Sequence, residues 1–491
     1  MKKYSAIVCA DNSAGANINN FLPSVNFEKC FAIGEKNFLN SDKVDFVQSE
    51  KYISNGIFSE ILNLISTDYF FLISSGSKIE FKENAIEKFI NSALKKNSGL
   101  TYSDYCIVDE NNRENEIPCI DYQSGSIRDN FDFGCIYLFN TNKTRNVIEK
   151  YGVPADDSFE IFFYDLRLKI ATDYEITHIS DLLYSKYKTP SDTEDKHFSY
   201  VAKENFNRQK TLETIASAHL KRIGAFLLPV TKKVKYDENK FLNIASIVIP
   251  VRNREKTIAD AVMSALNQKT DFPFNVIVID NHSTDKTTET LKGLAEKNRN
   301  LLHIIPEKND LQIGGCWNEA VLNDNAGMFC VQLDSDDIYI NECTLQKIVN
   351  AFYETGASAL VGSYSLVDFN LNSIPPGLID HKEWTDENGH NNGLRINGFG
   401  APRAYYTPVI RELLFPNVSY GEDYSVMIRI TRNYYIARIY ESLYYCRRWE
   451  NNSDSNISVQ TLNKFNFYKD SLRTAEIKER IELNKKYNQE F

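Results

Sequence analysis

The chain has 491 residues, of which 42% are hydrophobic and 25% are charged. This length exceeds what a single ordinary hydrophobic core organises, so we expect two or more domains. The formal net charge of −10 argues against nucleic acid as the main partner, because binding to a phosphate backbone needs a basic footprint.

The first half of the chain opens with a short apolar run that stops at Asp11, which is typical of a first β-strand rather than a signal peptide. Further along, residues 190–195 resemble a loop and residues 198–225 have helical periodicity. Residues 231–240 are charged and poor in apolar side chains, as expected of a linker. The nine cysteines lack paired CxxC spacing, which indicates reduced thiols and a cytoplasmic chain.

The second half alternates apolar strands with amphipathic helices. Residues 245–250 form a continuous apolar run typical of a buried parallel strand, and apolar residues spaced three and four apart predict a helix from Ile258 to Leu266. This alternation predicts a mostly parallel, Rossmann-like sheet with helices on both faces, whose ligands lie at the carboxyl ends of the strands. The other predicted elements are strands 275–279, 301–305 and 328–333 and a helix over about 286–297.

The two halves of the chain resemble each other. A gapless alignment with an offset of 260 residues superimposes apolar and aromatic positions across much of both halves, and this near-constant spacing predicts a duplicated domain. The matched positions include Tyr164 with Tyr424, Ile170 with Ile430, Tyr174 with Tyr434 and Leu183 with Leu443.

These observations predict a tandem α/β architecture. We expect one domain over residues 1–192 and a second over residues 241–456, joined by a helical connector and linker over 193–240. The Lys- and Glu-rich tail, residues 457–491, is expected to form one or two surface helices that pack on the second domain.

Three carboxylates follow the predicted strand that ends near Leu333, in the segment Asp334-Ser335-Asp336-Asp337. Carboxylate oxygens are the ligands that Mg²⁺ and Mn²⁺ prefer, and such an ion bridges diphosphate oxygens. The alternative is a turn followed by a helix N-cap, where Asp and Ser are also favoured.

Four motifs in order resemble those of family 2 glycosyltransferases with the GT-A fold, over about residues 243–455. They are Val248–Asn253 with Glu255, Val278–Thr287, Gly314–Asn318 and Asp334–Asp337. The chain departs from the family pattern at Asn281-His282, where two consecutive Asp followed by Gly are common, and at Trp317, where Arg is usual. The first departure leaves the identity of the nucleotide base open.

The resemblance also assigns roles to individual residues. Asp334 would contact the donor ribose and Asp336 would bind Mn²⁺ or Mg²⁺, with His390 as a tentative further ligand. In Gly421-Glu422-Asp423-Tyr424, which is similar to the family's acidic motif, Asp423 would be the general base and Glu422 an orienting residue. The predicted donor-binding residues are Pro250, Arg252, Glu255, Asp280, Asn281, Asn318, Asp334, Ser335, Arg447 and Arg448, and the predicted acceptor-binding residues are Trp384, Gly400 and Arg403.

The first copy lacks the acidic residues of the second. Ser74–Ser77 stand at the position of Asp334–Asp337, and Phe162-Phe163 stand at the position of Glu422-Asp423. Because neither segment can bind a cation or accept a proton, we expect a degenerate GT-A-like domain without catalysis. Acceptor-glycan binding, contact within a homodimer and structural support are the roles that remain.

The expected activity is metal-dependent, inverting and non-processive transfer of a hexose or N-acetylhexosamine. The donor would be a nucleotide-diphosphate sugar, and the acceptor a glycan or a lipid-linked molecule at the inner face of the cell membrane, with peripheral membrane association. Tyr445 stands where the processive pattern has Gln or Arg. One alternative is a sugar nucleotidyltransferase, although Pro250–Asn253 replaces a Gly-rich phosphate loop; another is a non-catalytic glycan-binding scaffold, which the intact acids oppose.

Overall fold

The structure is a computed structural model. It describes residues 3–9, 27–34, 44–49, 53–74, 78–155, 158–188, 206–229, 232–382, 384, 389–449 and 457–487. The predicted boundary at 192–193, residue 456 before the predicted tail, and the segment Ser75–Ser77 lie outside these ranges.

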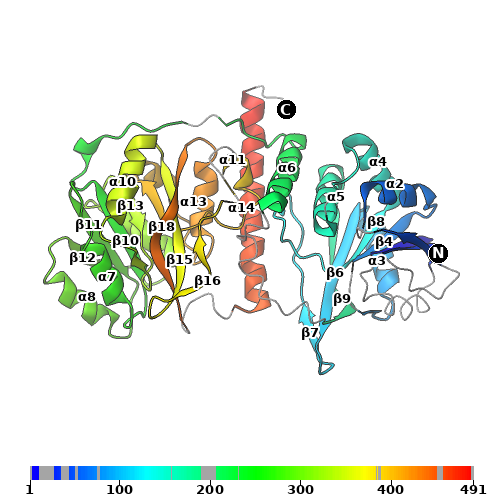
Figure 1. The fold of residues 1–491 in the computed structure, drawn as a ribbon, viewed down its shortest axis with the longest axis horizontal. Coiled ribbons are helices and arrows are strands. Elements are labelled where there is room, and N and C mark those ends of the chain that lie inside the picture. The colour runs from blue at the N-terminus through cyan, green and yellow to red at the C-terminus, as the bar shows by residue number, and fades with distance from the viewer. Residues whose placement is uncertain are drawn as a thin grey trace.

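The first half of the chain forms a nine-stranded sheet with helices packed against it (Figure 1). Its strands are β1 (Tyr4–Cys9), β2 (Cys30–Gly34), β3 (Val44–Gln48), β4 (Tyr69–Ser74), β5 (Ile79–Phe81), β6 (Leu100–Val108), β7 (Glu114–Ile117), β8 (Ile136–Asn140) and β9 (Ile176–Tyr187). Its helices are α2 (Asn55–Leu64), α3 (Ala85–Lys96), α4 (Thr141–Tyr151) and α5 (Phe159–Asp173).

The second half forms another nine-stranded sheet. Its strands are β10 (Ala245–Val251), β11 (Phe274–Asp280), β12 (Leu301–Ile304), β13 (Phe329–Gln332), β14 (Ile338–Tyr339), β15 (Ala359–Asp368), β16 (Ser373–Ile379), β17 (Arg403–Tyr406) and β18 (Ile436–Arg448). Its helices are α7 (Ile258–Leu266), α8 (Thr287–Ala295), α9 (Ile313–Val321), α10 (Thr344–Thr355), α11 (Gly389–Asn392), α12 (Thr407–Leu413) and α13 (Glu422–Ile430). The strands and helices predicted between residues 245 and 333 are confirmed, with ends that differ by a few residues.

The two sheets have the same topology. The first follows the order β3-β2-β1-β4-β8-β6-β9-β5 with β7 paired to β6, and the second follows β12-β11-β10-β13-β17-β15-β18-β14 with β16 paired to β15. Such agreement in strand order is expected of a duplicated domain. The sheets are mixed rather than mostly parallel, because β8 and β17 run antiparallel to both of their neighbours.

The segment between the sheets contains helix α6 (Phe206–Arg222) and the short 3₁₀ helix η5 (Glu238–Lys240). Between these two helices, Lys232 forms an isolated parallel bridge with Tyr434, so the linker contacts the second half before β10 begins.

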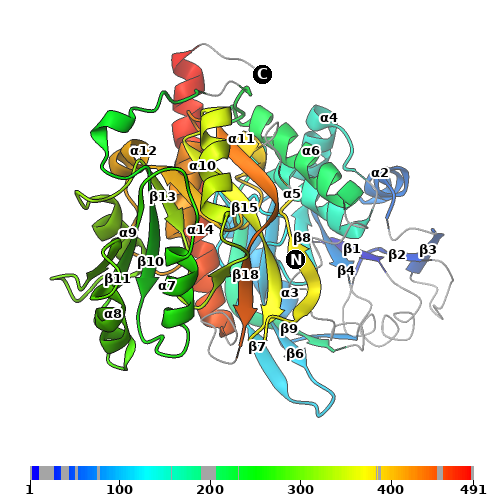
Figure 2. The same ribbon diagram turned by 60° about the vertical axis from the view of Figure 1, so that its left-hand side comes forward.

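The C-terminal tail is a single helix, α14 (Val459–Lys486), which lies between the two sheets in Figure 1 and is seen from another side in Figure 2. The Ser458 side chain caps it by accepting a hydrogen bond from the Thr461 N–H at 3.2 Å. The prediction that the tail forms surface helices on the second domain alone is therefore wrong, because α14 buries a stripe of side chains against both halves of the chain. The buried residues are Lys469, Asp470, Arg473, Glu476, Ile477, Arg480 and Asn484.

Each sheet has its own hydrophobic core, and β10 and β11 are buried almost throughout. Cys9, Cys135 and Cys330 are buried within these cores, and all nine cysteines are free thiols. Within the described ranges, no helix combines the length and apolar character that crossing a membrane requires.

Candidate active site

A pocket of about 440 Å³ opens at the carboxyl ends of β10 and β13, where ligands of open α/β sheets usually bind. Segments far apart in the sequence contribute to it, from the end of β10 to the end of β18. The lining residues include Pro250, Arg254, Gln332, Asp334, Ser335, Asp336, Asp337, Gly400, Arg403, Glu422 and Arg448.

The acidic segment follows β13 and turns tightly at the floor of this pocket. The Asp337 N–H donates to the Asp334 carbonyl at 3.1 Å, and the Gln332 amide donates to Asp334 Oδ1 at 2.8 Å. Burial raises the pKa of Asp334, and burial together with Asp334 and Asp336 raises the pKa of Asp337 well above its usual value. Crowded buried carboxylates favour either a shared proton or a bound cation.

The carboxylates fit a divalent ion that takes its remaining ligands from a substrate. Asp334 and Asp336 both line the pocket, and their oxygens are ligands that Mg²⁺ and Mn²⁺ prefer. The described residues contain no group of three or more His, Cys, Asp or Glu side chains arranged around a metal site.

Arg254 is a candidate that the sequence did not reveal. It lines the pocket, and its Nε lies 3.8 Å from Asp336 Oδ2. The Trp449 indole N–H also faces Asp336, at 3.4 Å. The predicted Arg252 is instead exposed and is not among the pocket-lining residues. Arg254 follows Arg252 by two residues and lies between Asn253 and Glu255 of the same motif, so the sequence does contain an arginine at the position that lines the pocket.

The opposite wall of the pocket is the start of helix α13. Gly421 precedes the helix with a left-handed φ of 83°, and Glu422 then lines the pocket. Asp423 Oδ2 lies 2.7 Å from Arg403 Nη1, which also donates to the Gly400 carbonyl at 2.7 Å. The Arg403 N–H donates to Gln332 Oε1 at 3.0 Å, so Gln332 contacts both Asp334 and Arg403 and connects the two acidic segments.

The two acids at the start of α13 have different environments. Burial and the neighbouring Asp423 raise the pKa of Glu422 to about 8. Burial opposes ionisation of Asp423, but Arg403 and Lys469 outweigh it and lower its pKa. The environment therefore favours the carboxylate form of Asp423 and the protonated form of Glu422.

Several predicted donor-binding residues have structural partners. Asp280 is fully buried and accepts hydrogen bonds from the Ser283 N–H at 3.0 Å and the Thr288 hydroxyl at 2.6 Å. Burial opposes its ionisation, but the bonds from His303, Ser283 and Thr288 prevail and lower the pKa of Asp280. The Asn281 amide donates to the Leu311 carbonyl at 2.8 Å. Neither Asp280 nor Asn281 is among the pocket-lining residues.

Of the remaining predicted donor-binding residues, some line the pocket and others do not. Pro250, Ser335 and Arg448 line the pocket. Arg447 does not: its side chain is 3% exposed and pairs with Asp260 at 2.9 Å. The last two candidates, Asn318 and Glu255, form hydrogen bonds that stabilise neighbouring segments. The Asn318 amide donates to the Phe415 carbonyl at 2.8 Å, and Glu255 Oε2 accepts from the Lys286 N–H at 3.1 Å.

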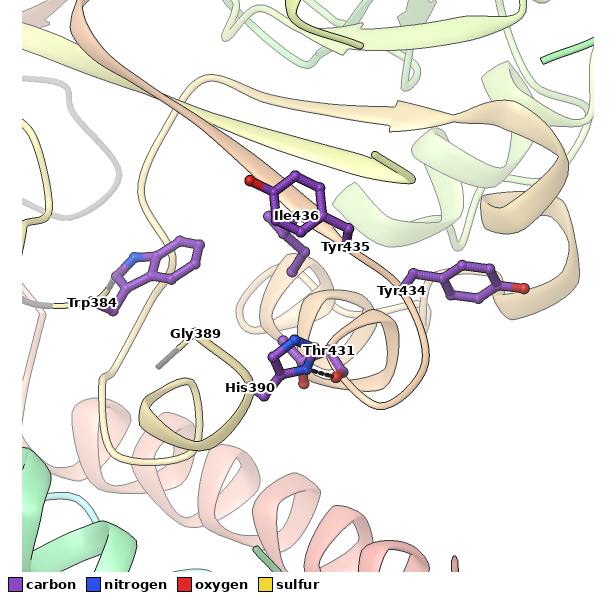
Figure 3. Close-up of a pocket in the computed structure, with 7 residues that line it drawn as sticks. All are labelled: Trp384, Gly389, His390, Thr431, Tyr434, Tyr435 and Ile436. Atoms are coloured by element: carbon purple, nitrogen blue, oxygen red, sulfur yellow. Dashed lines mark hydrogen bonds between the residues drawn. The ribbon is translucent and has the colours of Figure 1, made fainter. Parts of the chain in front are cut away.

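The structure places Trp384 and His390 away from this pocket, in a separate small hollow beside the end of α13 (Figure 3). Trp384 is 1% exposed, its indole N–H donates to the Phe399 carbonyl at 3.1 Å, and the Arg438 guanidinium lies 3.9 Å from its ring centroid. The His390 ring hydrogen-bonds through Nδ1 to the Thr431 carbonyl. The predictions that Trp384 stacks on the acceptor and that His390 binds the metal are therefore wrong, because neither residue lines the pocket of the acidic segment.

The corresponding positions of the first half form part of its hydrophobic core. Phe162 packs edge-on against Phe58 with ring centroids 4.9 Å apart, and Phe163 stacks on Tyr137 at 4.1 Å. Ser74 ends β4, and its N–H donates to the Cys135 carbonyl at 3.0 Å. These contacts replace the charged pocket of the second half.

Comparison with known proteins finds glycosyltransferases. The family model described as glycosyl transferase family 2 matches residues 246–407. An uncharacterized glycosyltransferase of Haemophilus influenzae is 28% identical over 131 residues, or 27% of this chain and 51% of that protein. The chain thus spans about half the length of this relative.

Two further relatives have more specific names. The Escherichia coli UDP-Glc:alpha-D-GlcNAc-diphosphoundecaprenol beta-1,3-glucosyltransferase WfgD is 28% identical over 199 residues, which are 40% of this chain and 73% of that protein. Among solved structures, S. aureus TarS 1-349 in complex with UDP-GlcNAc is 25% identical, covers 48% of this chain and 71% of that chain, and has a TM-score of 0.37.

The family match covers part of the pocket, from β10 through the acidic segment to β17, whereas Glu422 and Arg448 lie beyond the matched residues. The predicted pair of GT-A-like α/β domains and the predicted family are both confirmed. Residues 246–407, in the C-terminal half of this chain, therefore match the glycosyl transferase family 2 model.

Proposed function

We propose that the C-terminal half transfers a hexose or N-acetylhexosamine from a nucleotide-diphosphate sugar to a hydroxyl group of a glycan or lipid-linked acceptor. One observation carries this proposal: Asp334, Asp336 and Glu422 line a single pocket, and Asp423 is linked to it through Arg403, which also lines it. Had the two acidic segments opened onto different surfaces, they could not serve one bound sugar.

The protein groups would divide the work between donor and acceptor. A divalent ion held by Asp336 and Asp334 would neutralise charge on the diphosphate, and Arg448 and Arg254, which line the same pocket, would supply further positive charge. Both arginines are suited to bidentate contact with phosphate oxygens.

On the acceptor side, Asp423 is the proposed general base. Its lowered pKa keeps it ionised, so it can accept the acceptor proton as the hydroxyl oxygen attacks the anomeric carbon. Attack from the face opposite the leaving diphosphate gives inversion. Glu422, which keeps its proton, can donate a hydrogen bond that orients the acceptor.

The acceptor class rests on the relatives. The name of the Escherichia coli relative describes an undecaprenol diphosphate acceptor, so a lipid-linked sugar presented at the inner face of the cell membrane is the acceptor that we favour. The N-terminal half would take no part in the chemistry. Its polar contacts with α14 support a structural role rather than a second active site.

Product analysis tests the proposal. The full chain is incubated with Mn²⁺, a panel of UDP-, GDP- and dTDP-sugars and lipid-linked acceptors. Release of a free nucleoside diphosphate together with a lengthened acceptor is expected. Pyrophosphate as the product would indicate a nucleotidyltransferase instead. Failure of every donor to bind or to be hydrolysed would favour a glycan-binding scaffold.

A further inference from the structure

Helix α14 carries a buried lysine to the acidic start of helix α13. Lys469 is 6% exposed, and its ammonium group donates to the Asn397 carbonyl at 2.6 Å. The same ammonium lies 4.3 Å from the ring centroid of Tyr420 and 5.5 Å from that of Tyr424. These two tyrosines flank the segment Gly421-Glu422-Asp423, so the charge is fixed beside the proposed acceptor-side acids.

The lysine stem also packs directly on the residue before those acids. A β-carbon built on Gly421 would lie 3.4 Å from Cγ and 3.5 Å from Cε of Lys469. A glycine here both permits the left-handed backbone and leaves room for the lysine side chain. The contact brings an element from the far end of the chain against the N-cap of the helix that begins with Glu422.

Buried polar contacts fix α14 in this place. Asp470, the next residue, lies 3.3 Å from Arg128 Nε of the N-terminal half, and Arg473 Nε donates to the Tyr424 hydroxyl at 2.8 Å. The helix is thus held by the N-terminal half on one side and by α13 on the other. Its position, and with it the position of the Lys469 ammonium, is set by both.

We propose that Lys469 is a positioning residue for sugar transfer, which keeps the Asp423 carboxylate ionised and ready to accept the acceptor proton. This inference rests on the proposed function. The supporting geometry is a buried ammonium without a carboxylate hydrogen-bond partner among the contacts described above, held against the backbone that presents Glu422 and Asp423.

The charged groups around Asp423 and Lys469 come from three elements. Arg403 approaches from β17, Lys469 and Arg473 lie on α14, and Asp334 lies in the loop after β13. The neighbouring phenols belong to Tyr405, Tyr420, Tyr424 and Tyr468. Arg403 and Lys469 both lower the pKa of Asp423, whereas Asp423 and Glu422 repel each other. Without the lysine charge, only Arg403 of these two cations would counteract burial, which raises the pKa of Asp423.

The experiment compares the pH dependence of kcat in the full-length protein and in Lys469→Met. Loss of the charge is expected to move the acidic limb of the profile to higher pH by about one unit, which lowers the rate on that limb roughly tenfold. Lys469→Arg should restore the wild-type limb. Lys478→Met, on the exposed side of the same helix, is the matched control and should leave the profile unchanged.

An unchanged acidic limb in Lys469→Met, whatever its maximal rate, overturns the proposal, because a purely structural lysine would lower activity without moving the titration. If Lys469→Met does not fold, Lys469→Gln, which keeps a donor for the Asn397 carbonyl, takes its place with the same expectation.

A second measurement does not depend on catalysis. A double-mutant cycle combines Lys469→Met with Asp423→Asn and follows urea unfolding at pH 7. Non-additive effects are expected, and strict additivity overturns the inference. If the wild-type protein transfers no sugar while the cycle is non-additive, the proposed function fails and the electrostatic link between Lys469 and Asp423 stands.

Discussion

The contact between the two halves provides the sharpest test of the structure, at Asp470 on helix α14. This carboxylate is fully buried and accepts hydrogen bonds from Ser126 Oγ at 3.0 Å, Arg128 Nε at 3.3 Å and Arg473 Nη1 at 2.7 Å. Both arginines are buried as well, with 0–3% of their side chains exposed. Asp470→Asn keeps the shape of the side chain and removes its charge.

The expected cost follows from what the substitution leaves behind. Removing one partner of a buried ion pair leaves an uncompensated charge and costs about 3–5 kcal/mol. Here two guanidinium groups lose their carboxylate, so we expect Asp470→Asn to fall within this range rather than below it. The exposed pair of Asp181 and Lys88, with half of each side chain accessible, provides the control: Asp181→Asn should cost less than about 1 kcal/mol.

Urea unfolding followed by two probes measures this cost. All three tryptophans, Trp317, Trp384 and Trp449, lie in the C-terminal half, so their fluorescence reports on that half alone. Far-ultraviolet circular dichroism reports on both halves. In Asp470→Asn the two transitions should separate as the halves lose their coupling. Coincident transitions and a free energy of unfolding within about 1 kcal/mol of the wild type would refute the reasoning.

Four further outcomes are expected. Asp423→Asn should bind donor normally, by thermal shift, yet lose roughly 10²–10⁴-fold in kcat, and equal transfer rates would remove Asp423 from the mechanism. Asp336→Asn should weaken the stabilisation of the protein by Mn²⁺ with a nucleotide diphosphate, and an unchanged shift would contradict the proposed ligand. The pKa of Glu422 is raised from 4.5 to about 8 in the folded protein, so the folded state holds a proton that the unfolded state has lost, and stability should fall as pH rises between these values. Glu422→Gln should remove that slope from melting temperatures measured between pH 5 and 8, and parallel curves would refute the assignment. Trp384→Phe leaves the Phe399 carbonyl without its donor and should cost about 1–3 kcal/mol of stability while kcat/KM for the acceptor stays unchanged, whereas a selective loss of acceptor use would return Trp384 to the site.

The sequence predicted the parts of the fold whose pattern is dominated by burial. Strands such as Ala245–Val251 are buried on both faces, so their apolar runs stand out, and the acidic segment after Phe329–Gln332 falls where strand ends meet. The repeat was detectable because the aromatic framework persists where charges were lost, as at Tyr164 and Tyr424.

Other features could not be read from hydropathy. Helix α14 buries Lys469, Asp470, Arg473, Glu476 and Arg480, residue types that are mostly exposed, so a tail rich in them resembled a surface helix. The roles of Trp384 and His390 depended on which side of a loop faces the pocket, and that is decided by tertiary contacts with Phe399 and Thr431. Arg252 and Arg254 are equivalent by composition, and only the backbone turn distinguishes them.

The close approach at Gly125 has an evolutionary consequence. A β-carbon there would lie 2.1 Å from the Asp470 carbonyl oxygen and 2.3 Å from the Thr474 nitrogen, so any side chain would push the helix away. The N-terminal half thus carries a glycine fitted to a helix encoded more than 300 residues later. Domain shuffling between homologues would separate these matched surfaces, and a chimera should assemble only if it inherits the first half and the final helix from the same parent.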